Sequence, residues 1–166
     1  MVILSVLETD TIMSNDPIEI VTPMTQHFED LSLDPYWDEA GYPTIGYGHK
    51  LSSIQMKSLD TYPPISMDQA LKLLRDDLKH ALAGVRNSVK VPLRPYQMAA
   101  LIDLAFNIGS EAFSRSTLVA ELNEGNRGDI PHQFERWIYA NHHISAGLEE
   151  RRQAEARMWL NKPWRD

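Results

Sequence analysis

The sequence contains no cysteine, and this absence excludes several kinds of chemistry. Without cysteine the chain has no disulfide framework, no thiolate nucleophile and no metal site built on thiolates. Histidine does not supply an alternative, because His142 and His143 have no metal-ligand spacing with nearby acids or other histidines. We therefore expect no metal site and no cofactor.

Long apolar runs are also absent from the sequence. No stretch approaches the roughly 18 residues that a membrane span needs. The N-terminal MVILSVLETDT has a short apolar stretch, but no basic region precedes it and no clear small-residue cleavage site follows it. It is therefore a poor signal peptide. We expect no stable membrane association, an N-terminal extension at residues 1–16, and a single domain at residues 17–166.

Positive charge is missing from the first part of the chain. Residues 1–39 contain nine acidic residues and no Lys or Arg, whereas the rest contains 14 acidic and 16 basic residues, for a net charge of −7. Phosphate binding needs a basic surface, so nucleic acid is not expected as a partner. A neutral or sugar-rich polymer is compatible with this charge distribution.

The acidic residues are most concentrated in the stretch FEDLSLDPYWDEAGYPTIGYGH at residues 28–49. Like charges at close range raise one another's pKa and cost stability. The cluster is therefore either a solvated acidic surface or a site that uses carboxylates. Its members are Glu29, Asp30, Asp34, Asp38 and Glu39.

Local signals around this stretch predict a helix followed by a small sheet. Asn15 or Asp16 could cap a helix with Pro17 at its first position, or the helix could start at Thr22 because Pro23 would interrupt it. In both cases Glu29 lies at or just after the C-terminus of the helix. Residues 35–50 combine turn residues with β-branched and aromatic residues, and Glu39-Ala40-Gly41 is typical of a hairpin turn.

The chain after Pro64 is predicted to be helical throughout. A capping box, Ser66 to Gln69, precedes one amphipathic helix, and residues 95–108 are apolar nearly all round, as in a central helix. The predicted fold is α+β, with a β lobe at about residues 30–60, a helical lobe at about 65–162 and a cleft between them. The remaining helices are expected to start at Ser114 or Ser116, at Asp129 for the run IPHQFERWIYA, and at Ser145 to Gly147.

Three polar residues in the acidic stretch could carry acid–base chemistry. Glu29 has apolar and acidic neighbours, both of which raise a carboxyl pKa, as a general acid requires. Asp38, on the hairpin, is better placed to stay ionised and orient a water, and Thr44 could hold the same water. Spacing alone does not establish such a site, because any acidic loop contains Glu, Asp and Thr at some spacing.

Three blocks of the sequence resemble the phage-type lysozymes, the endolysin muramidases of T4-like and lambdoid phages. The first is E-x8-D-x5-T-I-G-Y-G-H, from Glu29 through Asp38 and Thr44 to His49. The others are QMAALIDLAFNIGSEAFSRSTLVAELNEG and GLEERRQAEARMWL, in the same order along the chain. The resemblance implies the lysozyme-like fold and hydrolysis of the β-1,4 bond between N-acetylmuramic acid and N-acetylglucosamine in peptidoglycan.

The resemblance also implies roles for individual residues. Glu29 matches the catalytic acid, Asp38 the carboxylate that activates or stabilises, and Thr44 the water-holding hydroxyl. An inverting mechanism places the two carboxyl groups roughly 6.5–9.5 Å apart. Substrate contacts are expected at Phe106, Ser116 and Tyr47. Arg151 matches a buried arginine near the catalytic acid, with Arg152 as its substitute, and His49 is expected to support the site by pairing with an acid.

These features predict an endolysin that lyses the bacterial host. We expect a monomer that stays in the host cytoplasm and needs a separate holin to reach the periplasmic cell wall. A lytic transglycosylase acting on the same bond is the nearest alternative, although such an enzyme has no water to position with Asp38 and Thr44. A virion-associated or toxin lysozyme and a non-catalytic wall-binding module are further alternatives.

Overall fold

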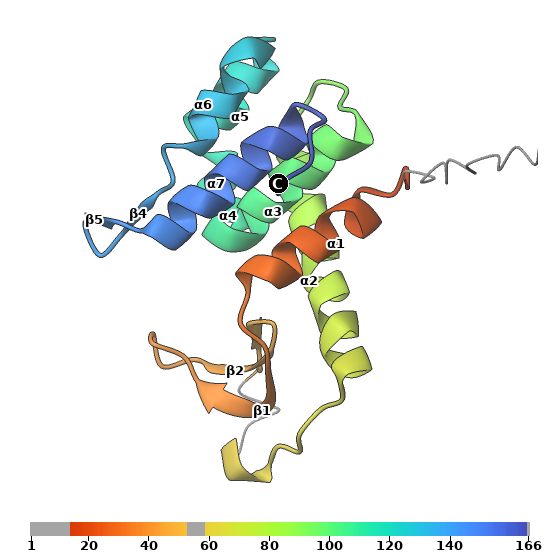
Figure 1. Cartoon of the computed structure of the whole chain (residues 1–166), viewed down its shortest axis with the longest axis vertical. Helices are drawn as coiled ribbons and strands as arrows, with labels where there is room; N and C mark the ends of the chain where they lie inside the picture. The colour runs from red at the N-terminus through yellow and green to blue at the C-terminus, as the bar shows by residue number, and fades with distance from the viewer. Residues whose placement is uncertain (1–13, 53–58, 166) are drawn as a thin grey trace, which may run out of the picture.

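The structure, a computed structural model, describes residues 14–52 and 59–165. A small sheet follows the first helix, and the other helices follow the sheet (Figure 1). The helices are α1 (Pro17–Phe28), α2 (Met67–Ser88), α3 (Pro95–Ile108), α4 (Ser110–Ser114), α5 (Thr117–Asn123), α6 (Ile130–Phe134) and α7 (Ala146–Trp159), with 3-10 turns η1 (Leu59–Thr61) and η2 (Arg127–Asp129). The strands are β1 (Ser32–Trp37), β2 (Pro43–Gly46), β3 (His49–Lys50), β4 (Tyr139–Ala140) and β5 (His143–Ile144).

The first helix begins at the cap formed by Asp16, whose carboxylate accepts a hydrogen bond from the backbone N–H of Ile18. Pro17 occupies the first helical turn, where its missing N–H costs nothing. The alternative start at Thr22 is therefore wrong, and Pro23 lies inside the helix. Of the predicted extension, residues 1–13 lie outside the described residues. The helix ends at Phe28, so Glu29 is its C-terminal cap residue, as predicted.

The sheet brings the proposed site residues of the hairpin together. Strands β1, β2 and β3 are antiparallel in that order, and Thr44 on β2 pairs with Tyr36 on one side and Lys50 on the other. The predicted turn is present, since the N–H of Gly41 donates to the carbonyl of Asp38. Gly41 has φ +81°, a conformation that glycine adopts at little cost.

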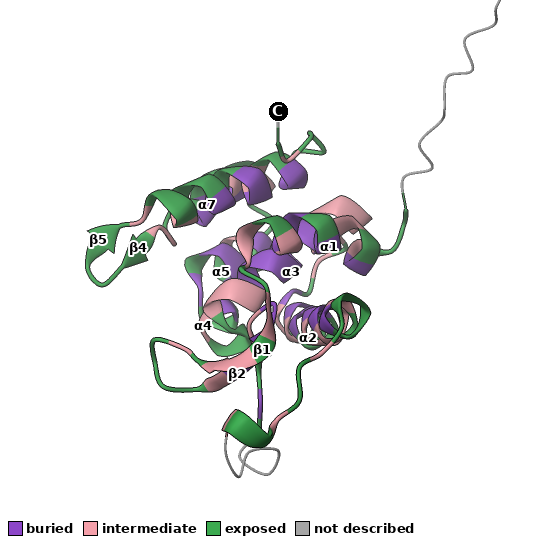
Figure 2. Ribbon diagram, turned by 60° about the horizontal axis from the view of Figure 1, so that its bottom comes forward, coloured by how far each residue is buried: buried purple, intermediate pink, exposed green. Residues whose placement is uncertain are grey.

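The core lies among the helices, with α3 at its centre (Figure 2). The prediction of an apolar central helix is confirmed, because seven successive residues of α3, from Ala99 to Ala105, are buried. The capping box that starts α2 is also present, with Ser66 and Gln69 each accepting the other's backbone N–H. Within the described residues, no helix combines the length and apolar character needed to cross a membrane.

One predicted helix is wrong over most of its length. The run that starts after Asp129 forms a helix only to Phe134, and Tyr139 to Ile144 form a two-stranded hairpin instead. Asn141 and His142 make the turn with φ +48° and +65°. Two successive positive φ values produce the tight hairpin turn that matches the twist of the strands.

Candidate active site

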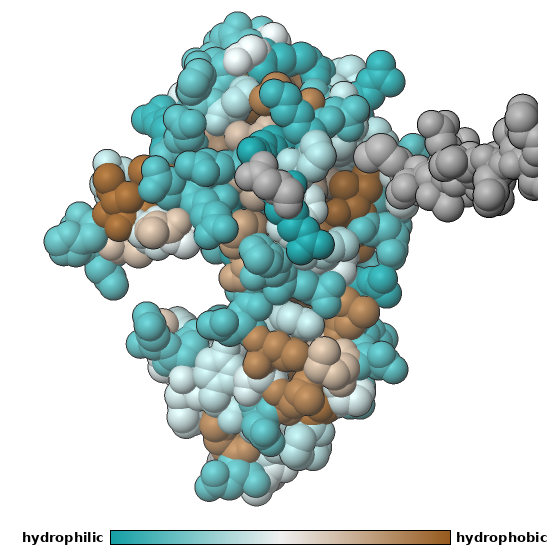
Figure 3. All heavy atoms as spheres, viewed as in Figure 1, coloured by the Kyte–Doolittle hydropathy of each residue, from teal (hydrophilic) through white to brown (hydrophobic). Residues whose placement is uncertain are grey.

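A cleft lies between the sheet and the helices, and it contains most of the predicted site residues. The space-filling view shows the surface hollowed between the β1–β2 and β4–β5 hairpins (Figure 3). The cleft has a volume of about 520 Å³. Its walls come from the end of α1, the sheet, α2 and α3: Glu29, Tyr36, Thr44, Tyr47, Gly48, His49, Lys50, Asp77, Phe106 and Asn107.

Glu29 is held in the wall of this cleft by a buried arginine. Nη1 of Arg151, on α7, donates to Oε1 of Glu29 at 2.6 Å. The side chain of Arg151 is 4% exposed and that of Glu29 is 22% exposed. Burial raises the pKa of Glu29 above its usual value, Arg151 opposes this rise, and the negative charges of Asp103 and Asp30 add to it. A carboxyl in this environment is suited to donating a proton.

Asp38, in contrast to Glu29, is kept ionised by hydrogen bonds to its carboxylate. The hydrogen bond from Lys50, together with the backbone N–H groups of Tyr42 and Ala40, lowers the pKa of Asp38. Asp38 does not line the cleft wall with Glu29. Lys50 links Asp38 to the cleft, because its ammonium donates to Asp38 Oδ2 and lies 3.3 Å from the hydroxyl oxygen of Thr44.

Thr44 is buried on β2, the central strand of the sheet, and its hydroxyl is already partly used. It donates to the carbonyl of Tyr42 at 3.0 Å and accepts from Lys50. A hydroxyl has one donor and two acceptor lone pairs, so one acceptor position is left. Thr44 can therefore accept a hydrogen bond from a water, but it cannot donate one without breaking its contact with Tyr42.

The other predicted residues of the cleft have defined partners. The Tyr47 hydroxyl accepts from Gln26 at 3.0 Å, and Phe106 places its ring 6.0 Å from the guanidinium carbon of Arg151. His49 pairs through Nδ1 with both carboxylate oxygens of Asp77, at 3.0 and 2.9 Å. The hydrogen bond and charge of Asp77 raise the pKa of His49. The prediction that His49 pairs with an acid is confirmed.

Ser116 lies away from the cleft that holds Glu29. Its hydroxyl donates to the carbonyl of Phe113 and accepts from the N–H of Val119, so it caps α5. It lines a separate hollow of about 420 Å³ between α4, α5 and α6. The structure thus gives Ser116 a helix-capping contact, and its predicted contact with substrate stays a prediction.

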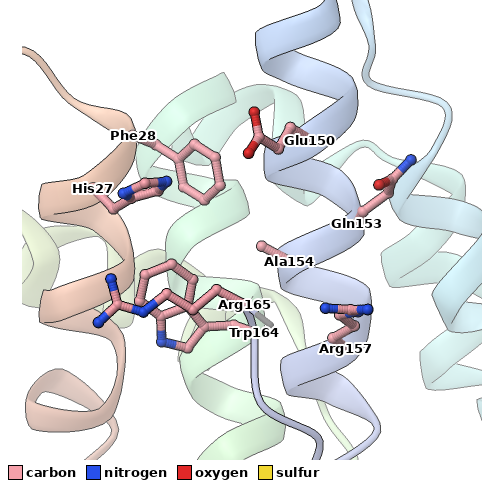
Figure 4. Close-up of a pocket in the computed structure, with 8 residues that line it drawn as sticks. All are labelled: His27, Phe28, Glu150, Gln153, Ala154, Arg157, Trp164 and Arg165. Atoms are coloured by element: carbon pink, nitrogen blue, oxygen red, sulfur yellow. The ribbon is translucent and has the colours of Figure 1, made fainter.

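A further hollow lies behind the end of α1, bounded by α7 and the C-terminal segment (Figure 4). The Trp164 ring packs against His27 and Phe28, with centroids 5.4 and 6.4 Å apart. Glu29 and Thr44 do not line this hollow, which measures about 200 Å³. Trp164 therefore contacts the last turn of α1, the turn that precedes Glu29.

Several residues of the site were not predicted from the sequence, among them the charged residues Lys50, Asp77 and Asp103. Lys50 directly follows the TIGYGH block, and its pairing with Asp38 depends on strand register. Asp77 lies on an amphipathic helix among other charges, where nothing distinguishes it. Asp103 could have been recognised, because it is a charged residue within an otherwise apolar helix. Among the described residues, no group of three or more His, Asp or Glu is arranged to hold a metal.

Comparison with known proteins identifies similar sequences. The model of the phage lysozyme family matches residues 26–155. A protein from Escherichia phage Mu named SAR-endolysin is 38% identical over 133 residues, which are 80% of this chain and 74% of the phage protein.

Solved structures with the same fold include two at 29% sequence identity. The muramidase domain of SpmX from Asticaccaulis excentricus has a TM-score of 0.75, and the match covers 85% of this chain and 95% of that domain. A mutant of P22 lysozyme has a TM-score of 0.74, with 89% of this chain and 99% of that protein covered. These matches agree with the predicted α+β fold in which a cleft separates a sheet from helices.

Proposed function

The chain belongs to the phage lysozyme family and is a peptidoglycan hydrolase, and from this premise we propose that Glu29, Asp38 and Thr44 carry the reaction. The observation that supports the proposal most is the pair of carboxyl groups with pKa values moved in opposite directions. Such pairs supply an acid and an ionised partner at the same pH. The bond cleaved is the β-1,4 bond between N-acetylmuramic acid and N-acetylglucosamine.

In this mechanism the Glu29 carboxyl donates its proton to the oxygen of the glycosidic bond. Arg151 fixes the carboxyl through Oε1, which leaves Oε2 for the proton and the substrate. A water on the opposite side donates one hydrogen bond to Thr44 and passes its proton to Asp38 as it attacks the sugar. Asp38 stays ionised because Lys50 and two backbone N–H groups bind its charged form.

The remaining cleft residues position the sugar chain. Phe106 and Tyr47 offer ring faces and a hydroxyl at the cleft wall, and Asn107 lies next to Phe106. His49 and Asp77 hold strand β3 against α2 from the cleft side. Ser116 is proposed to contact substrate only where the sugar chain extends towards the hollow by α5.

A lytic transglycosylase would cleave the same bond with one acid and no water. Thr44 and Asp38 argue against it, because a residue that orients a water has no role when the sugar closes its own ring. The two mechanisms leave different ends on the products, a reducing muramic acid for the hydrolase and a 1,6-anhydro end for the transglycosylase.

The proposed biological role is lysis of the bacterial host by an endolysin. The protein is proposed to act as a monomer on the periplasmic cell wall, after release from the host cytoplasm through a holin pore. The endolysins among its relatives support lysis of the host as the role, whereas the monomeric state and the holin route belong to the proposal alone. Expression with and without a holin, followed by cell fractionation, tests the route, since lysis without the holin would contradict it.

Digestion of purified Gram-negative sacculi, followed by mass spectrometry of the muropeptides, tests the reaction. The proposal predicts products with reducing muramic acid ends. Products with anhydro ends would identify the transglycosylase. Binding of the protein to sacculi without release of any muropeptide would identify a wall-binding module.

A further inference from the structure

A group of charged side chains is buried beneath Glu29, at the junction of α1, α3 and α7. Asp103, Arg152 and Glu155 are 0% exposed, and Arg151 is 3% exposed. Burial of a charge is costly unless the charge is paired and hydrogen-bonded. The reaction proposed above uses Arg151 but gives no role to Asp103, the acid that α3 places in the middle of this group.

Asp103 accepts two hydrogen bonds from the Arg151 guanidinium, whereas Glu29 accepts one. Nε of Arg151 donates to Oδ2 of Asp103 at 2.8 Å, and Nη2 donates to Oδ1 at 3.0 Å. Only Nη1 reaches Glu29. A bidentate pair of this kind fixes the plane of the guanidinium as well as its position. Thr25, on α1, fixes the carboxylate in turn by donating to Oδ1 at 2.7 Å.

The charge of Asp103 decides how strongly Arg151 acts on Glu29. A lone buried guanidinium beside a carboxyl would favour its ionised form, which cannot donate a proton. Burial works against the charge of Asp103, but Arg151 and the hydrogen bonds from Glu155 and Thr25 keep the pKa of Asp103 at about 2. Asp103 therefore stays negative at every working pH. Its charge offsets that of Arg151 and adds to the rise in the pKa of Glu29.

Glu155 does not replace Asp103 in this arrangement. Its Oε1 is 4.0 Å from Nε of Arg151, and its Oε2 is 3.2 Å from Nη1 of Arg152. Burial raises the pKa of Glu155 well above its usual value. In the described part of the chain, the other charged or titratable groups around Glu29 are Arg152 on α7, Asp30 beside it in the chain, and Tyr36, Tyr47, His49, Lys50 and Asp77 across the cleft.

We propose that Asp103 is a positioning residue for the acid: it holds the Arg151 guanidinium against Glu29 and offsets enough of its positive charge for Glu29 to keep its proton. The proposal rests on the proposed role of Glu29. It differs from a purely structural ion pair because it makes the protonation of Glu29, and not only the stability of the fold, depend on Asp103.

The test compares Asp103→Asn with Thr25→Val in the full chain. Each variant removes a buried hydrogen bond of the Asp103 carboxylate, but only Asp103→Asn removes a charge. For Asp103→Asn we expect the alkaline limb of kcat against pH on sacculi to move down by about one unit or more. Thr25→Val should lower the melting temperature and leave the limb in place.

A second measurement does not depend on the stability of either variant. Carbon-13 NMR of the carboxyl groups of the wild-type protein should show Asp103 titrating near pH 2 and Glu29 above its usual value. Asp103 titrating at higher pH than Glu29 would overturn the inference. So would a folded Asp103→Asn protein with the wild-type pH profile.

The outcome separates this inference from the proposed function. If Glu29→Gln is inactive while Asp103→Asn keeps the wild-type alkaline limb, the acid is correctly assigned and only the role of Asp103 fails. If Glu29→Gln is as active as the wild type, the proposed acid itself is wrong.

Discussion

The pKa values of two carboxyl groups near the cleft, those of Glu29 and Asp38, are shifted in opposite directions because their neighbours differ. Burial raises the pKa of Glu29, whereas hydrogen bonds from Lys50 and the hairpin backbone lower that of Asp38. In the proposed mechanism, activity requires protonated Glu29 and ionised Asp38. It should therefore fall as the pH rises through the pKa of Glu29 and as it falls through that of Asp38, giving a bell-shaped profile.

Replacing Lys50 with Met should move the acid limb of this profile. Without the ammonium, Asp38 loses the strongest influence that lowers its pKa and takes up a proton at higher pH. We expect the acid limb of the plot of kcat against pH to move to higher pH, while the alkaline limb, which we assign to Glu29, stays in place. The measurement is kcat against pH on sacculi.

The matched control for Lys50 is Lys72→Met. Lys72 makes an exposed ion pair with Asp76 on α2, so its loss removes the same charge without touching Asp38. A Lys50→Met profile that coincides with that of Lys72→Met would show that Lys50 does not act on Asp38.

The secondary structure was predicted correctly where local signals decide it. The cap at Ser66 was predicted outright and the cap at Asp16 as one of three alternatives; both depend only on residues two or three positions away, and both are present. The β4–β5 hairpin was missed because its turn residues, Asn141 and His142, lack the glycine that usually marks such a turn. The apolar residues before the turn fitted a helix equally well by their spacing.

The close packing of α2 against α4 provides a prediction for these elements. A methyl group added at Gly84 would lie 2.5 Å from Oγ and 2.8 Å from Cβ of Ser110. The hydroxyl can rotate away, but Cβ cannot, so the helices must move apart. We expect Gly84→Ala to lower the free energy of unfolding by about 1–3 kcal/mol, measured by urea denaturation.

A second substitution provides the control for Gly84. Changing Ser110 to Gly in the Gly84→Ala background removes both close atoms and should restore most of the lost stability. An increase in stability for Gly84→Ala alone, as at an ordinary helical glycine, would contradict the predicted clash.

The arrangement of the whole molecule explains why the site could be predicted only in part. Glu29, Asp38 and Thr44 lie within one short stretch, so a family resemblance could predict them together. The contacts that tune Glu29 join residues far apart: Arg151 is 122 positions from Glu29 and 48 from Asp103. No local pattern encodes such contacts, and they follow only from how α1, α3 and α7 pack.

The buried ion pair also makes the stability of the whole fold depend on pH. The pKa of Asp103 is about 2 in the folded protein and 3.8 without its neighbours. Its contribution is therefore present above pH 3.8 and is lost as the pH falls towards 2. We expect a loss of about 2 kcal/mol over this range, measured by urea unfolding at successive pH values.

Asp103→Asn and Asp76→Asn together test this assignment. Asp103→Asn should reduce the decline in the free energy of unfolding between pH 4 and pH 2. Asp76→Asn on α2 should keep it: Lys72 and Lys79 lower the pKa of Asp76 to about 2 as well, but solvent screens these exposed ion pairs, so they contribute little to stability. An equally steep decline without Asp103 would assign the acid sensitivity to other groups.

The turnover rate of Glu29→Gln on purified sacculi, compared with the wild type, tests the central claim most directly. Glutamine keeps the size of the side chain and can still accept from Arg151, but it cannot donate an acidic proton. With the fold verified by its melting curve, this variant should lose roughly 10²–10⁴-fold in kcat. A folded Glu29→Gln protein that releases muropeptides at the wild-type rate would contradict the account.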